Sequence, residues 1–206
     1  MRHGILFFCM ILMAFSPALA VATPKPIILV LGDSLSAAYG IRQEEGWVSL
    51  LQHRLREQHF PHTVINASIS GETTAGGVSR IHDLLAEHAP AVVIVELGGN
   101  DGLRGTPLQR IRQNITTIIQ ASQESGAKAI LVGMQIPPSY GMRYTQSFAA
   151  LYPEVAKRFN ALLVQNFLES VGDTPQLMQS DRIHPTADAQ PILLEKVWPL
   201  LYEAIQ

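Results

Sequence analysis

The chain has 206 residues, of which 47% are hydrophobic and 7% aromatic, and its formal net charge at pH 7 is −2. This composition fits one compact domain and excludes a largely disordered chain. Lysine and arginine are scattered, and no basic stripe is present that would neutralise a row of phosphates, so we expect no nucleic-acid partner.

The first twenty residues have the pattern of a secretory signal peptide. Arg2 and His3 precede an apolar run at residues 5–15, and the small residues at 18–20 have the spacing that signal peptidase requires. A membrane-spanning helix needs about 20 apolar residues, which is more than this run supplies. We therefore expect cleavage after about residues 20–22, no stable membrane anchor, and a periplasmic or secreted enzyme.

Beyond this segment, short β-branched runs alternate with longer amphipathic stretches. The runs predict strands at residues 27–31, 63–65, 91–97, 129–132 and 161–164. The stretches predict helices at residues 47–60, 78–88, 108–122, 148–159 and 190–204, and Pro199 is expected to bend the last helix or end it early. Strands that alternate with helices form a parallel sheet. The sequence therefore predicts a single three-layer α/β/α domain over residues 23–206.

Three of the predicted strands are followed by polar, glycine-rich segments. These are GDS at 32–34, NASISG at 66–71 and GGND at 98–101. Ligands bind at the carboxyl ends of the strands in such sheets, so the three segments are expected to converge. Each is weak evidence alone, because these residues are common in turns and helix caps. Taken singly, Ser34 is better interpreted as a cap.

The segment before the last predicted helix changes that interpretation. Asp181 and His184 are three residues apart, which puts both side chains on the same side of one turn, and Pro185 favours a loop conformation for His184. A serine hydroxyl needs a base within about 3 Å, and the base needs a partner that fixes its tautomer. Ser34, His184 and Asp181 supply that set.

Metal and cofactor chemistry have little support in the sequence. The only cysteine, Cys9, lies in the predicted signal peptide, so a cysteine nucleophile, a disulfide framework and cysteine-ligated zinc are excluded for the mature chain. Neither an HExxH motif nor a glycine-rich nucleotide motif occurs. We expect no metal and no cofactor, and we expect surface positions for His53, His59, His62, His82 and His88.

The segments GDSLSAAYG, NASISGETTAGG, VIVELGGNDGLRG and DRIHP together resemble the GDSL or SGNH hydrolases, whose marker residues would be Ser34, Gly71, Asn100 and His184. Within this family the chain is most similar to bacterial periplasmic thioesterases and lysophospholipases, a group that includes arylesterases. The resemblance implies a flavodoxin-like fold with five parallel strands. It also implies an enzyme that hydrolyses small acyl esters, thioesters or lysophospholipids, and we expect this enzyme to be a monomer. Arg182 departs from the pattern, because similar proteins often have glycine there; a cation at this position is expected to narrow the entrance or perturb His184.

The mechanism that these residues support is acyl transfer to water. Ser34 attacks the carbonyl, His184 transfers the proton, and Asp181 orients the imidazole. Asp33 is expected to be a turn or cap residue. The resemblance assigns the oxyanion hole to the backbone N–H groups of Ser34 and Gly71 and to the side-chain amide of Asn100.

An apolar, proline-rich loop after the fourth predicted strand is expected to bind the acyl group. Its predicted substrate-binding residues are Ile136, Pro137, Pro138, Tyr140 and Met142. Two alternatives remain. A carbohydrate O-deacetylase would use the same fold and triad. A non-catalytic binding module is less favoured, because it has no reason to retain Ser34, Asn100, Asp181 and His184 together.

Overall fold

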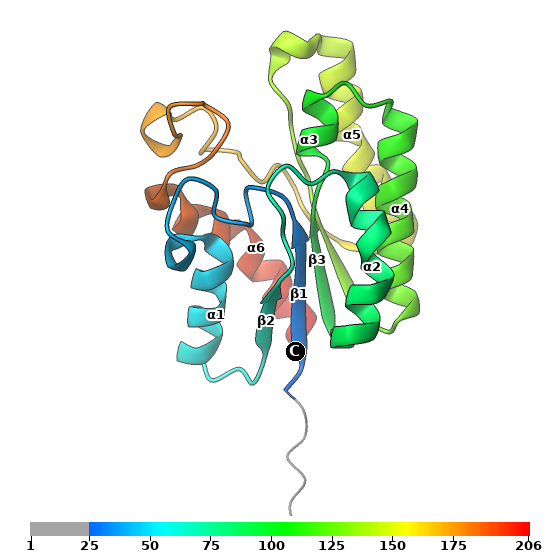
Figure 1. The fold of residues 1–206 in the computed structure, drawn as a ribbon, viewed down its shortest axis with the longest axis vertical. Coiled ribbons are helices and arrows are strands. Elements are labelled where there is room, and N and C mark those ends of the chain that lie inside the picture. Colours follow the sequence, from blue (N-terminus) through cyan, green and yellow to red (C-terminus); the bar gives the residue numbers. More distant parts are fainter. Residues whose placement is uncertain (1–24) are drawn as a thin grey trace, which may run out of the picture.

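The structure is a computed structural model that describes residues 25–206, so the predicted signal peptide lies outside the described residues. Five strands form one parallel sheet in the order β2-β1-β3-β4-β5 (Figure 1). The strands are β1 Ile27–Gly32, β2 Thr63–Asn66, β3 Val92–Glu96, β4 Lys128–Val132 and β5 Leu162–Val164. All five lie where the sequence predicts them, and the order is that of a flavodoxin-like sheet.

Helices cover both faces of the sheet, which confirms the predicted three layers. The helices are α1 Trp47–Glu57, α2 Thr74–His88, α3 Gly99–Leu103, α4 Leu108–Glu124, α5 Met142–Phe159 and α6 Gln190–Ile205. Helix α1 packs against α6 on one face, and α2, α4 and α5 form the other layer (Figure 1). Single 3₁₀ turns occur at Gln43–Glu45, Pro138–Tyr140, Pro175–Leu177 and Ala187–Ala189.

The central strands β1, β3 and β4 are almost entirely buried. Their sequences are continuous apolar runs and not alternating ones, because a parallel strand between two helical layers has no solvent-facing side. Two charged residues interrupt these runs: Lys128 is exposed at the start of β4, and Glu96 is fully buried at the end of β3. The tight packing of these strands gives the loops at their carboxyl ends a rigid base.

Several predicted helix limits differ from the structure. Helix α2 begins at Thr74, ahead of the predicted 78, because the side chain of Thr73 accepts the N–H of Gly76 at 3.3 Å and caps the first turn. Helix α1 ends at Glu57 and not at 60, helix α5 starts six residues earlier than expected, and α3 was not predicted.

The prediction that Pro199 ends the last helix early is wrong, because α6 continues through it to Ile205. A proline deprives the carbonyl four residues earlier of its partner, and here that residue is the exposed Glu195. Water can satisfy this carbonyl, while Val197 and Leu201 on the opposite side remain fully buried and hold the helix on the sheet.

The order of the strands determines where a ligand can bind. From β1 the chain passes to β2 on one side, and β3 then pairs with the other side of β1. The carboxyl ends of β1 and β3 therefore flank the crevice in which doubly wound proteins bind their ligands. Within residues 25–206, no helix combines the length and the apolar character that crossing a membrane requires.

Candidate active site

Ser34 lies in a tight turn directly after β1. Asp33 caps this turn: its Oδ1 accepts the N–H of Leu35 at 3.1 Å, and its carbonyl accepts the N–H of Ala37 at 2.9 Å. Asp33 therefore has the turn-capping role that was expected of it, and Ser34 is not needed as a cap. The Ser34 hydroxyl instead points to His184, with 2.9 Å between Oγ and Nε2.

His184 also contacts the predicted carboxylate. Its Nδ1 lies 2.6 Å from Oδ2 of Asp181, and Oδ1 of Asp181 accepts the backbone N–H groups of Ile183 at 2.9 Å and His184 at 3.1 Å. With Nδ1–H donating to a carboxylate, Nε2 is the acceptor for the serine hydroxyl. The structure thus brings Ser34, His184 and Asp181 into one chain of hydrogen bonds.

These contacts keep Asp181 ionised. The hydrogen bond from His184, followed by the backbone N–H of Ile183, lowers the pKa of Asp181 to about 2. The carboxylate, whose side chain is 38% exposed, is therefore charged at neutral pH, and it can stabilise a protonated imidazole.

The loop that carries His184 is held on both sides. The backbone N–H of Gln179 donates to the His184 carbonyl at 2.8 Å, and the ring of Tyr39 lies against the imidazole with centroids 4.4 Å apart. Arg182 has a φ of +57°, in the left-handed region that favours glycine. Because His184 keeps both of its ring contacts, Arg182 does not displace it.

Two backbone donors in the loops after β1 and β2 are unpaired. Within residues 25–206, the N–H groups of Ser34 and Gly71 have no hydrogen-bond acceptor. Gly71 has a φ of +81°, which a residue with a side chain rarely adopts, and its carbonyl accepts Nη2 of Arg104 at 3.3 Å. The loop after β2 is joined to β1 by the N–H of Ile69, which donates to Gly32 at 3.1 Å.

Asn100 lies in the first turn of α3, at the carboxyl end of β3. Its Nδ2 is 3.0 Å from Oδ2 of Asp33 and 3.0 Å from the carbonyl of Glu72. These contacts connect Asn100 to the loops after β1 and β2. Each of its two N–H groups has an acceptor, so a third acceptor at this site must share one of them or displace its partner.

Two neighbours of the site were not predicted from the sequence. Tyr39 comes from the turn after β1, and nothing in its local sequence distinguishes it. Glu96 did leave a signal, because a charged residue inside the apolar run VVIVEL is unusual for a buried strand. Oε2 of Glu96 accepts the hydroxyl of Ser36 at 2.7 Å.

The predicted acyl-binding loop lies beside α3, because a Cβ atom at Gly102 of α3 would be 2.7 Å from the side chain of Ile136. Ile136 is buried and close to Gly102, so it belongs to the core, unlike the open groove lining that was expected. The other predicted residues of the loop are exposed: Pro137, Pro138, Tyr140 and Met142.

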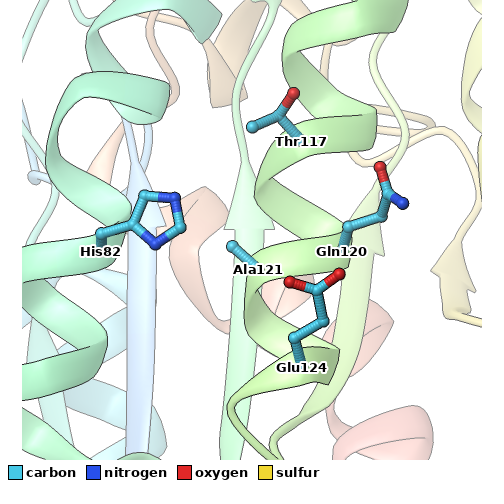
Figure 2. A pocket seen from close by; sticks show the side chains of 5 residues that line it. All are labelled: His82, Thr117, Gln120, Ala121 and Glu124. Carbon is cyan, nitrogen blue, oxygen red and sulfur yellow. The ribbon is translucent and has the colours of Figure 1, made fainter.

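Two hollows lie outside the triad. One, of about 440 Å³, adjoins the loop of His184 and is lined by Gly172, Asp173, Pro175, Met178, Gln179, Ser180 and Arg182. The other, of about 160 Å³, lies between α2 and α4, with His82 facing Glu124 across it (Figure 2). His82 is exposed there, as are His53 and His59, whereas His62 and His88 are partly buried. No three His, Cys, Asp or Glu residues in the part of the chain described could jointly hold a metal ion.

Comparisons with known proteins agree with this geometry. Residues 30–190 match the GDSL-like Lipase/Acylhydrolase family. The chain is 47% identical to the esterase TesA of Pseudomonas aeruginosa, over 98% of both chains, and 41% identical to thioesterase 1/protease 1/lysophospholipase L1 of Escherichia coli, over 94% of this chain and 89% of that one. A crystal structure of TesA superposes with a TM-score of 0.85 at 49% identity, covering 86% of this chain and 99% of that one.

These relatives confirm the resemblance that the four motifs indicated, and the superposition confirms the SGNH hydrolase fold. The chain therefore belongs to the GDSL-like Lipase/Acylhydrolase family, and it is an enzyme that hydrolyses acyl esters.

Proposed function

We propose that the enzyme cleaves acyl esters and thioesters through an acyl-enzyme on Ser34. The observation that carries this proposal is the chain of hydrogen bonds from Ser34 through His184 to Asp181. His184 Nε2 takes the proton of the Ser34 hydroxyl as its oxygen attacks the carbonyl carbon, and it returns the proton to the departing alcohol or thiol. A water molecule then repeats these steps and releases the acid.

The charge that develops on the carbonyl oxygen needs hydrogen-bond donors. The N–H groups of Ser34 and Gly71 are suited to this role, because they have no acceptor within residues 25–206. Asn100 is the third donor, and its amide gives up or shares one of its two contacts when the oxyanion forms. Neutral amides suit this position because they do not compete with His184 for a proton.

The acyl group is bound by apolar side chains around the crevice. Large hydrophobic residues that are exposed on the loops after β1, β2 and β4 and next to His184 are Tyr39, Ile69, Tyr140, Met142 and Ile183. Exposed apolar side chains of this size can contact a fatty acyl chain, which is the group that fatty acyl thioesters and lysophospholipids share. The E. coli relative is named for both activities. All the proposed site residues come from a single chain, which is consistent with a monomer.

The proposal includes export. The pattern of residues 1–20 supports a signal peptide that is removed after about residues 20–22, which leaves a periplasmic or secreted enzyme. The mass of the N-terminal peptide of protein purified from its native compartment tests this directly.

A serine-directed phosphonate tests the nucleophile. We expect the reagent to abolish activity, and peptide mass spectrometry should locate the phosphonyl group on Ser34. The Ser34→Ala variant should be folded, unlabelled and inactive, whereas Ser79→Ala, which changes an exposed serine on α2, should be labelled like the wild type. Label on another residue, or hydrolysis by a folded Ser34→Ala variant, contradicts the assignment.

A further inference from the structure

Two buried carboxyl groups lie directly beneath the nucleophile. Asp33 is 2% exposed and Glu96 is fully buried. Oε2 of Glu96 accepts the hydroxyl of Ser36 at 2.7 Å and the backbone N–H of Asp33 at 3.3 Å. Glu96 therefore holds the turn on both sides of Ser34. Glu96 Oε2 is also one of the atoms that a side chain at Gly32 would strike, at 2.9 Å, so the two strand ends are closely packed.

Asp33 connects the same turn to Asn100. Its Oδ1 accepts the N–H of Leu35 and its Oδ2 accepts Nδ2 of Asn100. The two carboxyl groups also affect each other, because the charge of Asp33 raises the pKa of Glu96. Two ionised carboxylates at this buried place would repel each other, whereas a proton on one of them lets it donate a hydrogen bond to the other.

The environment of Glu96 favours the proton there. Its Oε1 is buried, and no described residue donates a hydrogen bond to it. A buried, ionised oxygen without a donor is costly, whereas a protonated carboxyl can donate. Asp33 differs, because N–H groups donate to both of its oxygens, and such donors stabilise an ionised carboxylate.

We propose that Glu96 is a positioning residue that keeps its proton at neutral pH and donates it to Asp33, so that the pair carries one negative charge, on Asp33. This proposal rests on the proposed roles of Ser34 and Asn100 for its effect on catalysis. The carboxylate of Asp33 then holds the amide of Asn100 and the turn of Ser34 in fixed positions. A second charge would drive the two carboxyl groups apart and disturb both contacts.

The charges around the pair are consistent with a single ionisation. Burial, followed by the charge of Asp33, raises the pKa of Glu96 well above its ordinary value, and burial raises the pKa of Asp33 to about 6. Other titratable groups that interact with the pair are Tyr152 of α5 and His184, and Asp101 of α3 in turn interacts with Tyr152. Burial also raises the pKa of Tyr152, which keeps it neutral.

Amide substitutions distinguish which carboxyl carries the proton. Glu96→Gln supplies an N–H in place of the O–H and a carbonyl for Ser36, so we expect its kcat to stay within about threefold of wild type. Asp33→Asn removes the charge that Asn100 contacts, and we expect kcat to fall about a hundredfold with little change in KM, as for a lost oxyanion contact. The reverse pattern, or equal effects on kcat in variants that melt normally, would overturn the assignment.

A spectroscopic measurement separates this inference from the nucleophile assignment. At pH 7 the infrared spectrum should contain the C=O stretch of a protonated carboxyl, present in the wild type, in Asp33→Asn and in inactive Ser34→Ala, and lost in Glu96→Gln. The alkaline decline of kcat that accompanies ionisation of Glu96 should also be missing in Glu96→Gln. Absence of the band in the wild type refutes the proposal whatever the role of Ser34 proves to be.

Discussion

At Asn100, one side-chain amide faces three acceptors once an oxyanion forms. Two of them, Oδ2 of Asp33 and the carbonyl of Glu72, are already 3.0 Å away. These contacts fix the plane of the amide before substrate arrives, so an oxyanion can share one of its N–H groups, or displace the acceptor there, without rotation of the side chain. They also mean that Asn100 contributes to stability as well as to the proposed catalysis, and the two contributions have to be measured separately.

Asn100→Ala separates them. A structural amide costs about 1 kcal/mol of stability when it is lost and leaves kcat nearly unchanged. An oxyanion donor contributes about 3 kcal/mol in the transition state, so we expect kcat to fall about a hundredfold while KM stays similar. Asn114→Ala is the matched control, because its amide binds the Thr74 hydroxyl at 2.9 Å, away from the triad. Steady-state kinetics and thermal melting of both variants measure the two contributions. If kcat of Asn100→Ala equals that of Asn114→Ala, the role of Asn100 is structural only.

Residues differ in how far their sequence reveals them. Asp181 and His184 can be recognised because their spacing and Pro185 fix their geometry locally. Asp33 was expected to cap a turn, and it does, but its contact with Asn100 joins residues 67 positions apart that no local pattern relates. Ile136 was expected in an open groove and is buried, because its apolar character serves packing and binding equally well.

Among the elements, the short helix α3 was the one that periodicity did not predict. Its sequence, GNDGL, contains two glycines and no amphipathic pattern, so tertiary contacts must determine it. At its N-cap, Gly98 has a φ of +112° and packs so closely against Tyr152 that a Cβ atom there would collide with the tyrosine hydroxyl. That hydroxyl is itself fixed by its bond to the Leu97 carbonyl at 3.0 Å. The central strands β1, β3 and β4, by contrast, were predicted because burial on both faces makes each one almost continuously apolar.

Gly98→Ala should therefore disturb both stability and the position of Asn100. We expect a loss of about 2–4 kcal/mol in the free energy of unfolding, because left-handed backbone strain adds to a clash with a buried ring. Gly105→Ala is the control, since Gly105 also has a positive φ, of +67°, but nothing within 4 Å of its Cβ position. Gly105→Ala should lower the free energy of unfolding by only about 1 kcal/mol, because it adds left-handed backbone strain without a clash. Urea unfolding compares the two, and equal losses would show that the contact with Tyr152 is unimportant.

For the whole molecule, the buried carboxyl pair makes stability depend on pH. Because the pKa of Glu96 is raised well above 4.5, the folded chain binds a proton that the unfolded chain releases above that pH. The free energy of unfolding therefore falls as pH rises from about 4.5 toward the raised pKa of Glu96. Asp33 lowers the free energy of unfolding further as pH rises from 3.8 to about 6. Asp181 has the opposite effect, because its pKa is lowered. Its contribution to the free energy of unfolding is fully present above pH 3.8 and is lost as the pH falls toward about 2.

Urea unfolding of the wild type and Glu96→Gln between pH 5 and pH 8 measures this effect. One proton contributes a slope of about 1.4 kcal/mol per pH unit, so the decline should be shallower in Glu96→Gln by up to that amount. Glu124→Gln, which alters an exposed glutamate at the end of α4, should run parallel to the wild type. A Glu96→Gln curve that also runs parallel would mean that Glu96 is ionised in the folded protein.

The separation of Ser34 and His184 along the chain, 150 residues, also affects when activity can begin. A ribosome or a translocation channel delivers the nucleophile long before its base, and β5 and the loop of His184 must arrive before Ser34 has a partner. A partly synthesised or partly exported chain thus contains a serine that is chemically inert. If the chain is exported and hydrolyses acyl lipids, as proposed above, this delay protects the membrane that it crosses, because hydrolysis starts only after the chain has left the membrane and folded.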